Sequence, residues 1–533
     1  MTALDRDQTD DPSGSMARPR LRTRWVGLAT ATAAALVLAV SRITHAAVGP
    51  DAIAYIAVAT SLKAGNGIGF FLENPLVTWP PLWPALLALG MAITGWRGDV
   101  VALLINSVVL AGCVPLGIAV ARRVLASPTV LGVLAASLAV SPLLIGLTVI
   151  VQTEVVFALL VLGMILAIMR GAETRLSRWL VLAGVFTAVA FYIRYQALYV
   201  VPVLAFWLVA SSWLRSRSVP AALRAGLWYS VPAVIPSAVW IARNLSVSDT
   251  AMGPRFPSDL GPVSNAAGAL RTVFKFVTSI PEAPLLPSAL LTATVGVIAI
   301  IWLVRVTRPE TGGPRYRDRA IEAFCGWAGL LAVFIAGFTA LMIVSRSLIG
   351  FDDLDIRLLS PCLVPTSILF LRYVEIVLLQ DRGARSRLAG RVLLGVWLAP
   401  QVLLTLALVG PANSIVADTG YNADRAVAAS SSLALDAIPE GCVTYSNNAA
   451  DLYRSGFEAE PSPRTVEYKS TQPTDDLSEL VERVESGQRS CLVWIEYTVD
   501  DENYSPAQLA TSLRLERLAS ADRVTVYELS AAG

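Results

Sequence analysis

Long apolar segments recur along the first 410 residues of this chain, and they constrain its fold more than any other feature. Most are close to the roughly 20 residues that a helix needs to cross the hydrocarbon core of a bilayer. Only 15% of the 533 residues are charged and 55% are hydrophobic, a balance that a soluble protein of this size does not need. We therefore expect eleven membrane-spanning helices, at residues 25–44, 100–121, 129–148, 155–169, 179–193, 197–214, 225–242, 287–304, 323–344, 358–374 and 392–410.

Basic residues between these segments predict the orientation of the chain, because cytoplasmic loops of membrane proteins collect Lys and Arg. With a cytoplasmic N-terminus, five short loops on that side hold 18 basic residues, and the longer external segments before residue 413 hold fewer. Residues 1–24 carry four arginines between positions 18 and 24 and no clear cleavage site follows, so we expect a cytoplasmic tail and a retained first anchor. Residues 82–95 are apolar but short, and a crossing there would invert every later loop. We expect an interfacial or re-entrant helix at this position.

The balance of charge changes near residue 412 and indicates a domain boundary. Residues 1–412 hold 33 basic and 20 acidic residues, whereas residues 413–533 hold 9 and 20. The predicted fold class is a polytopic α-helical membrane protein, with a transmembrane domain at 25–412 and a small extracytoplasmic α/β domain at 413–533. In the latter we expect strands near 442–445, 491–495 and 523–528, a helix ending before Gly487 and another near 506–515. An acidic exported domain argues against a nucleic-acid partner.

The five cysteines divide between the two regions. Cys113, Cys325 and Cys362 lie in predicted spans, where a free thiol packs as a small apolar side chain. Cys442 and Cys491 share the exported domain, where oxidation is available. These two residues form either a disulfide or a pair of buried thiols on neighbouring strands.

The first external loop, about residues 45–99, contains the most unusual sequence. Residues 51–64 have the pattern of an amphipathic helix that ends at Gly65. Asp51 stands in its first turn, where the helix dipole keeps a carboxylate ionised, and Tyr55 shares its face. Trp79 and the two prolines after it form a rigid corner. A purely structural loop has little need of an acid at this position, whereas an enzyme that deprotonates a hydroxyl does.

Further acids and arginines are expected at the outer ends of the helices, and a second external loop rich in Pro, Gly and Ser spans about 243–286. Charges near a bilayer are costly, so their collection on one side indicates a polar cavity. An acid that removes a proton and arginines that neutralise a phosphate suit a group-transfer reaction. A single histidine, His45, leaves little material for a Ser-His-Asp triad or a His-rich zinc site. The charged candidates are Glu154, Arg194, Arg243, Asp352, Asp353, Asp355 and Arg357.

Each candidate also has a structural interpretation. Asp51 could serve only as a helix cap, Glu154 could only pair with an arginine, and the arginines could extend to lipid headgroups. The three aspartates between 352 and 355 are more typical of a solvated loop than of a metal site.

The first loop also contains a spaced pattern of residues that resembles a known family. It reads Asp51-xxx-Tyr55-xxx-Ala59-xx-Leu62-xx-Gly65-x-Gly67, followed by Trp79-Pro-Pro-Leu82-x-Pro84. This pattern resembles the first external loop of C-type (GT-C fold) glycosyltransferases, and it is most similar to the branch of protein O-mannosyltransferases and the lipid A aminoarabinose transferase. Weaker matches follow in the expected order at Thr153-Glu154, Arg194-Tyr195, Arg243-Asn244 and Asp355-x-Arg357 with Pro361. The resemblance covers about residues 25–410.

The resemblance implies a reaction. Members of this family transfer sugars from polyprenyl phosphate outside the plasma membrane, usually with inversion. By this resemblance Asp51 would be the general base, and Glu154 a second acid in the acceptor or sugar pocket. Arg194 and Arg357 would hold the lipid phosphate, in a substrate-binding set completed by Tyr55, Trp79, Tyr195 and Arg243. The implied partners are a polyprenyl-phosphate-linked sugar, membrane lipids and a glycan, lipid or protein acceptor.

The sequence departs from the family pattern at two positions, and two other functions are alternatives. Ala52 stands where many relatives have a second acid, and no histidine stands beside Glu73 to complete a metal site that some relatives show, so a divalent metal is an open cofactor. The chain could instead be a transporter or flippase of a lipid-linked glycan, although repeated halves and broken mid-membrane helices, which transporters often have, are not visible. It could also be a catalytically silent member that acts as an envelope interaction protein.

Overall fold

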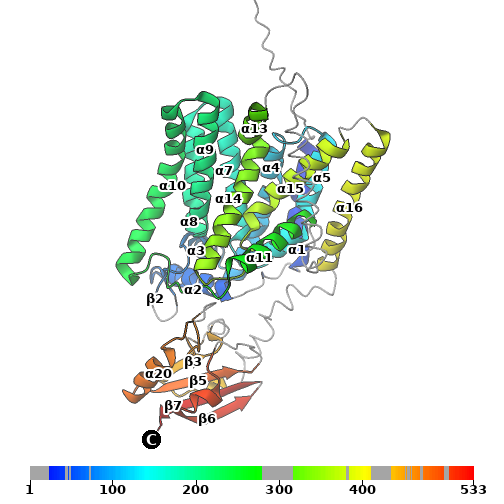
Figure 1. The fold of residues 1–533 in the computed structure, drawn as a ribbon. Coiled ribbons are helices and arrows are strands. Elements are labelled where there is room, and N and C mark those ends of the chain that lie inside the picture. The colour runs from blue at the N-terminus through cyan, green and yellow to red at the C-terminus, as the bar shows by residue number, and fades with distance from the viewer. Residues whose placement is uncertain are drawn as a thin grey trace, which may run out of the picture.

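The computed structural model describes residues 23–278 apart from 42–45, 47–49 and 71–73, residues 316–409 apart from 380–382, and most of 434–532. Within the last range, positions 450–451, 453–456, 458, 468–471, 497–502 and 522 lie outside the described residues. Figure 1 shows a bundle of long helices with a small sheet domain below it. We call the end of the bundle that carries helix α2 (Pro50–Ala64) the α2 end.

Nine segments in the described ranges are long and apolar enough to cross a membrane. A shorter apolar helix, α8 (Ser177–Ile193), occupies the predicted segment 179–193. The predicted segments thus correspond to helices, except that residues 287–304 lie outside the described residues. The nine are α1 (Thr23–Val40), α4 (Gly98–Ala121), α5 with α6 (Pro128–Ala139, Pro142–Thr148), α7 (Glu154–Thr174), α9 (Ala197–Ser216), α10 (Val219–Ser248), α14 (Trp327–Leu348), η1 with α15 and η2 (Ser360–Cys362, Leu363–Val374, Glu375–Leu379) and α16 (Ala384–Val409); α13 (Tyr316–Cys325) precedes α14.

A break between α5 and α6 divides one of these spans, and the sequence did not reveal it. In a bilayer, the backbone groups released by such a break need partners within the protein. Thr405 of α16 donates a hydrogen bond to the carbonyl of Val140 at 2.7 Å. Ser137 donates to Gln401 Oε1, also on α16, at 2.7 Å, and Gln401 is fully buried. Polar contacts therefore attach α16 to the broken helix.

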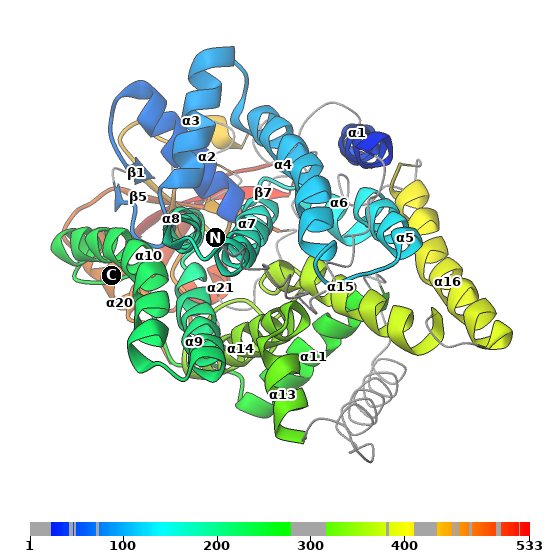
Figure 2. The same cartoon turned by 90° about the horizontal axis from the view of Figure 1, so that it is seen from above.

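The first loop forms two helices, as predicted. α2 is followed by a short hairpin of β1 (Gly69–Phe70) and β2 (Asn74–Pro75) and then by α3 (Leu82–Thr94). In Figure 2, α3 is seen lengthwise whereas α1 is seen nearly end-on, so α3 runs across the direction of α1. This direction is the one expected for an interfacial helix.

Residues 262–278 form a further helix, α11 (Pro262–Thr278), inside the region predicted to be an irregular external loop. Its buried residues Asn265, Ala269, Thr272 and Phe276 are spaced three or four apart, and α11 packs against α14 and α15. The Pro and Gly residues of the flanking turns led to the prediction of an irregular loop at this position in place of a helix.

The C-terminal domain contains a five-stranded sheet in the order β4-β3-β5-β7-β6, with β3 parallel to β4 and β5 and the other pairs antiparallel. Alternate residues of β5 face opposite sides, so Leu492 packs with Leu480 of α20 while Val493 joins a second buried cluster. The elements are β3 (Val443–Ser446), β4 (Glu460–Pro461), α20 (Asp476–Glu485), β5 (Ser490–Ile495), α21 (Pro506–Leu509), β6 (Leu513–Ala521) and β7 (Val524–Ala531), with η3 (Leu435–Ala437) before them.

Two predictions for this domain are decided by the structure. Cys442 and Cys491 form a disulfide, which selects one of the two alternatives. The helix expected near 506–515 is wrong beyond Leu509, because the following residues pair with β7 as the edge strand β6. The predicted domain boundary near residue 412 falls outside the described residues.

Candidate active site

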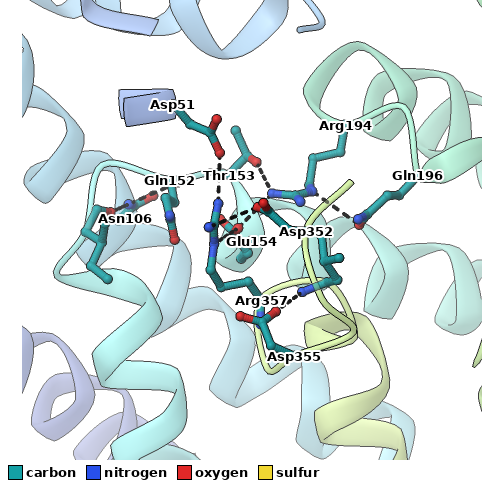
Figure 3. A network of polar contacts seen from close by, with 12 residues as sticks. Asp51, Asn106, Gln152, Thr153, Glu154, Arg194, Gln196, Asp352, Asp355 and Arg357 are labelled. Carbon is teal, nitrogen blue, oxygen red and sulfur yellow. Dashed lines mark hydrogen bonds and ion pairs between the residues drawn. The ribbon is translucent and has the colours of Figure 1, made fainter. Parts of the chain in front are cut away.

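Arg357 lies at the centre of a network of charged side chains at the α2 end of the bundle (Figure 3). Its Nη2 donates to Asp51 Oδ2 at 2.9 Å, its Nε to Glu154 Oε1 at 3.2 Å and its Nη1 to Asp352 Oδ2 at 3.4 Å. The three acids come from α2, from the start of α7 and from the loop before η1. One guanidinium therefore joins three segments that are far apart in the sequence.

The carboxylates around Arg357 determine its protonation. Burial alone would lower the pKa of the Arg357 guanidinium, but the negative charges of Glu154, Asp51 and Asp352 outweigh this effect and raise that pKa above its ordinary value. Arg357 is thus a permanent cation. Asp355 fixes the turn that presents it, because Asp355 Oδ1 accepts from the backbone amides of Arg357 at 2.9 Å and Leu358 at 3.1 Å.

Glu154 is the first residue of α7 and is fully buried. Its Oε1 is shared by two arginines, Arg357 at 3.2 Å and Arg194 at 2.8 Å. Its Oε2 is also buried and has no hydrogen-bond partner among the described residues. A buried carboxylate is normally paired and hydrogen-bonded on both oxygens, so Glu154 retains an unused acceptor inside the network.

Asp51 differs from Glu154 in its access to solvent. Its side chain is 34% exposed, whereas that of Glu154 is 0% exposed. The surrounding protein raises the pKa of the Asp51 carboxyl, and the charge of Arg357 opposes this rise. Asp51 is therefore the acid of this pair that a molecule in solution could reach.

Tyr55 and Trp79 lie beside Asp51. The Tyr55 ring meets the Trp79 ring edge-on, with centroids 6.2 Å apart, and Tyr55 is only 4% exposed. Burial and the nearby Asp51 charge raise the pKa of the Tyr55 phenol, so it stays protonated. The two rings join the first turns of α2 to the Trp-Pro-Pro corner, which positions the acid against the rest of the site.

Arg194 ends α8 and completes the network from another element. Besides Glu154, its Nη1 contacts Thr153 Oγ1 at 2.9 Å, and its Nε donates to Gln196 Oε1 at 3.3 Å. The structure therefore brings Asp51, Glu154, Arg194 and Arg357 together.

Tyr195 and Arg243, by contrast, contact the backbone of the first loop. The Tyr195 hydroxyl donates to the Val77 carbonyl at 2.7 Å and accepts from Trp240 Nε1 at 2.9 Å. Arg243 Nη1 donates to the Leu76 carbonyl at 2.6 Å, and its guanidinium lies 4.8 Å from the centroid of the Trp240 ring. In the structure these two residues hold the segment before Trp79, and their contact with substrate stays a prediction.

Arg255 is a charged residue that the sequence analysis did not select. It follows Gly253, whose φ of 78° and close approach to Thr78 turn the loop after α10 back against the first loop. Arg255 is exposed, its Nη2 donates to the Met252 carbonyl at 2.8 Å, and its charge interacts with Tyr199 and Tyr195. Among the described residues no acid lies within ion-pair distance of Arg255. Asp249 and Asp259 lie within six residues of it, so the sequence alone gives no signal that separates Arg255 from an ordinary loop arginine.

The acids of this site also bear on whether the protein could hold a metal ion. Within the described ranges, no group of three or more His, Cys, Asp and Glu side chains has the geometry to hold a metal ion. Glu73 lies outside the described residues, and a divalent metal cofactor stays a prediction.

Comparison with known proteins gives the fold an independent basis. Residues 78–240 match the sequence model of the family described as dolichyl-phosphate-mannose-protein mannosyltransferase. No curated protein is significantly similar to the chain in sequence. Among solved structures, ArnT from Cupriavidus metallidurans bound to undecaprenyl phosphate is similar with a TM-score of 0.54 and 16% identity, over 95% of this chain and 98% of ArnT. The apo state of ArnT gives a TM-score of 0.56 and 15% identity over the same shares.

A third similar structure is the arabinofuranosyltransferase AftD from Mycobacteria, with a TM-score of 0.51 and 14% identity over 96% of this chain and 42% of AftD. The fold is of the GT-C type. The resemblance inferred from the first loop is thereby confirmed, and so is the prediction of a helical membrane protein with a small C-terminal sheet domain.

Proposed function

We propose that this chain is a membrane glycosyltransferase that transfers a sugar from a polyprenyl-phosphate donor to a hydroxyl of an acceptor on the extracytoplasmic side. The observation that carries this proposal is the pairing of a partly exposed Asp51 with the guanidinium of Arg357 at 2.9 Å, in a fold similar to that of ArnT. A base and a cation side by side are what a hydroxyl nucleophile and a phosphate leaving group require.

In the proposed reaction, Asp51 removes the proton of the acceptor hydroxyl. The acceptor oxygen attacks the anomeric carbon, while the bond from that carbon to the phosphate oxygen breaks and the phosphate leaves with the electron pair. A single displacement of this kind inverts the anomeric centre. Phosphate needs little protonation to leave, so a strong base with cationic stabilisation of the leaving group is sufficient.

The cations of the site have different parts in this proposal. Arg357 and Arg194 both contact Glu154, which keeps their guanidinium planes in place. A donor phosphate that binds Arg357 would compete with Asp51 for the same nitrogen atoms, and this would release Asp51 to act as base. Arg255, whose charge interacts with Tyr195, supplies a further positive charge that no described acid neutralises.

The orientation follows from the distribution of arginines. With the N-terminus in the cytoplasm, the α2 end and the sheet domain are extracytoplasmic, and a donor embedded in the outer leaflet reaches Arg357 from the membrane. The acceptor is a hydroxyl of a glycan, lipid or protein.

The test is the Asp51→Asn variant. Purified protein is added to membranes from a deletion strain, which supply the native acceptors, together with a radiolabelled polyprenyl-phosphate sugar, and the release of polyprenyl phosphate is measured. Loss of the base is expected to lower the rate by about 10²–10⁴-fold. Asp99→Asn is the matched control, because Asp99 also stands in the first turn of a helix and pairs with an arginine, Arg97, at 2.6 Å.

Two results would contradict the proposal. Full activity of Asp51→Asn would remove the proposed base. Movement of the labelled lipid across the membrane without formation of a glycosidic bond would identify a transporter or flippase instead.

A further inference from the structure

Arg346 is a fully buried arginine in the last turn of α14, separate from the network around Arg357. Its Nη2 lies 2.7 Å from Asp259 Oδ1 and 3.4 Å from Asp353 Oδ1, and its Nη1 donates to Ser258 Oγ. The guanidinium also lies 5.8 Å from the centroid of the Phe351 ring. One buried cation therefore contacts two loops, the segment 256–260 after α10 and the segment 349–354 after α14.

Backbone contacts join the same two loops. The amide of Gly350 donates to the carbonyl of Phe256 at 2.8 Å, and Pro257 forms an isolated antiparallel bridge with Ile349. α11 closes the arrangement from the side, where Thr272 donates to the Leu354 carbonyl at 2.8 Å. The two loops thus form one packed unit around the Arg346 side chain.

This unit leads directly into the charged network of the proposed active site. Arg255 immediately precedes the first of the two loops. Asp352 lies within the second loop, and Arg357 follows it by three residues. The contacts of Arg346 therefore hold the second loop, whose Asp352 lies 3.4 Å from Arg357 Nη1, against the loop that follows Arg255.

We propose that Arg346 is a positioning residue for the anionic phosphate of the donor. It holds in place the loop that leads to Arg357, and with it the Arg357 guanidinium, and it touches no substrate itself. This inference rests on the proposed function, since it needs a phosphate ligand at the α2 end. A planar guanidinium suits the role because it donates in several fixed directions at once, which a lysine ammonium does not.

A purely structural role for Arg346 makes a different prediction. A buried arginine that only stabilises the fold would affect the melting temperature and leave the protein that remains folded with normal affinity. A positioning residue would change the affinity for a phosphate ligand in protein that is still folded. Asp259 and Asp353 are 33% and 69% exposed, so water can solvate both after Arg346 is replaced, and the fold has a means to tolerate the change.

The experiment uses the full chain in nanodiscs and undecaprenyl phosphate as the probe. Arg346→Gln and Arg346→Lys are compared with wild type by hydrogen exchange of residues 256–260 and 349–357 and by equilibrium binding of the probe. We expect faster exchange in both loops and a dissociation constant raised by up to about 10²-fold for Arg346→Gln, the scale of loss that misplacement by about 1 Å produces. Arg346→Lys should show a smaller rise.

Arg123→Gln is the matched control, since Arg123 is 4% exposed and bound to Glu173 at 2.7 Å at the other end of the bundle. It should leave both readouts unchanged. Unchanged exchange in Arg346→Gln would overturn the inference, and so would faster exchange with unchanged affinity. A wild-type protein that binds no undecaprenyl phosphate would instead overturn the proposed function, and the inference with it.

Discussion

The two ends of the helix bundle each contain a buried carboxylate paired with arginine, and the two sites differ in how completely they are satisfied. At the α2 end, Glu154 Oε1 serves two arginines while Oε2 has no partner among the described residues. At the other end, Glu375 in η2 is 1% exposed and uses both oxygens. Glu375 accepts from the amides of Ala126 and Ser127, before α5, and from Arg372 Nη1 at 2.7 Å.

This difference separates a structural role from a functional one. Glu375 supplies acceptors to backbone amides just before a helix, as a capping side chain does, and its hydrogen-bonding capacity is used within the protein. Glu154 lies among charges that the protein has concentrated but not fully paired. Glu154 thus keeps an unused acceptor close to the partly exposed Asp51, and such a site is suited to bind a ligand.

The Glu154→Gln variant tests this difference between the two carboxylates most directly. The amide oxygen can still accept from Arg194 or Arg357, so the fold should survive, but the loss of negative charge frees both guanidinium groups from their shared anchor. We expect the rate of sugar transfer to fall by about 10²-fold or more, within the range seen when an electrostatic group of an active site is removed. Transfer assays and thermal melting of the same preparation check this. Normal activity with a lowered melting temperature would show that Glu154 resembles Glu375 after all.

The converse prediction concerns Glu375→Gln. An amide retains one acceptor where the carboxylate serves two backbone amides and an arginine, so the variant should be destabilised by about 1.5–3 kcal/mol, the contribution of a hydrogen bond to a charged group. Activity per folded molecule should stay unchanged. Chemical denaturation followed by a transfer assay on the folded fraction tests both statements, and Arg385→Gln, at an exposed site near the start of α16, serves as a control.

The positions of the two carboxylates illustrate what the sequence could and could not predict. Apolar length and arginine-rich loops predicted the helices, because the bilayer imposes both constraints on a local stretch of chain. The spaced first-loop pattern selected Asp51, and the helix starts and ends selected Glu154, Arg194 and Arg357. Asp51 and Glu154 meet the Arg357 guanidinium across 306 and 203 positions of sequence, and Arg194 joins through Glu154. The resemblance to GT-C enzymes implied this convergence, and spacing alone did not show it.

Other parts were missed for identifiable reasons. The roles of Arg346 and Arg255 depend on which loops meet at the α2 end, and a long loop does not reveal its partners. The helix expected near 506–515 extended into the start of β6, because the exposed face of this edge strand carries charged residues such as Arg514 and its pairing with β7 decides the structure. The contacts of Tyr195 and Arg243 with the first loop are likewise tertiary.

The smallest expected effect is a shift in the pH dependence of activity, which distinguishes Asp51 from an ordinary surface acid. The surrounding protein raises the pKa of Asp51 above the ordinary 3.8, and Arg357 opposes the rise. Since a base must be ionised, activity should be lost as pH falls through this raised pKa. Arg357→Gln should move the acid limb of kcat/KM to still higher pH, measured on its residual activity.

The raised pKa of Asp51 also predicts how the stability of the protein depends on pH. A carboxyl whose pKa is higher in the folded state than in the unfolded state binds its proton more tightly when folded, so its ionisation opposes folding above that pKa and ceases to do so below it. Asp51→Asn should therefore melt at the same or a higher temperature than wild type at neutral pH, and the difference should shrink as pH falls. A melting temperature that drops at neutral pH would mean that the bond to Arg357 outweighs the effect of burial, and that Asp51, like Glu375, is held mainly for structure.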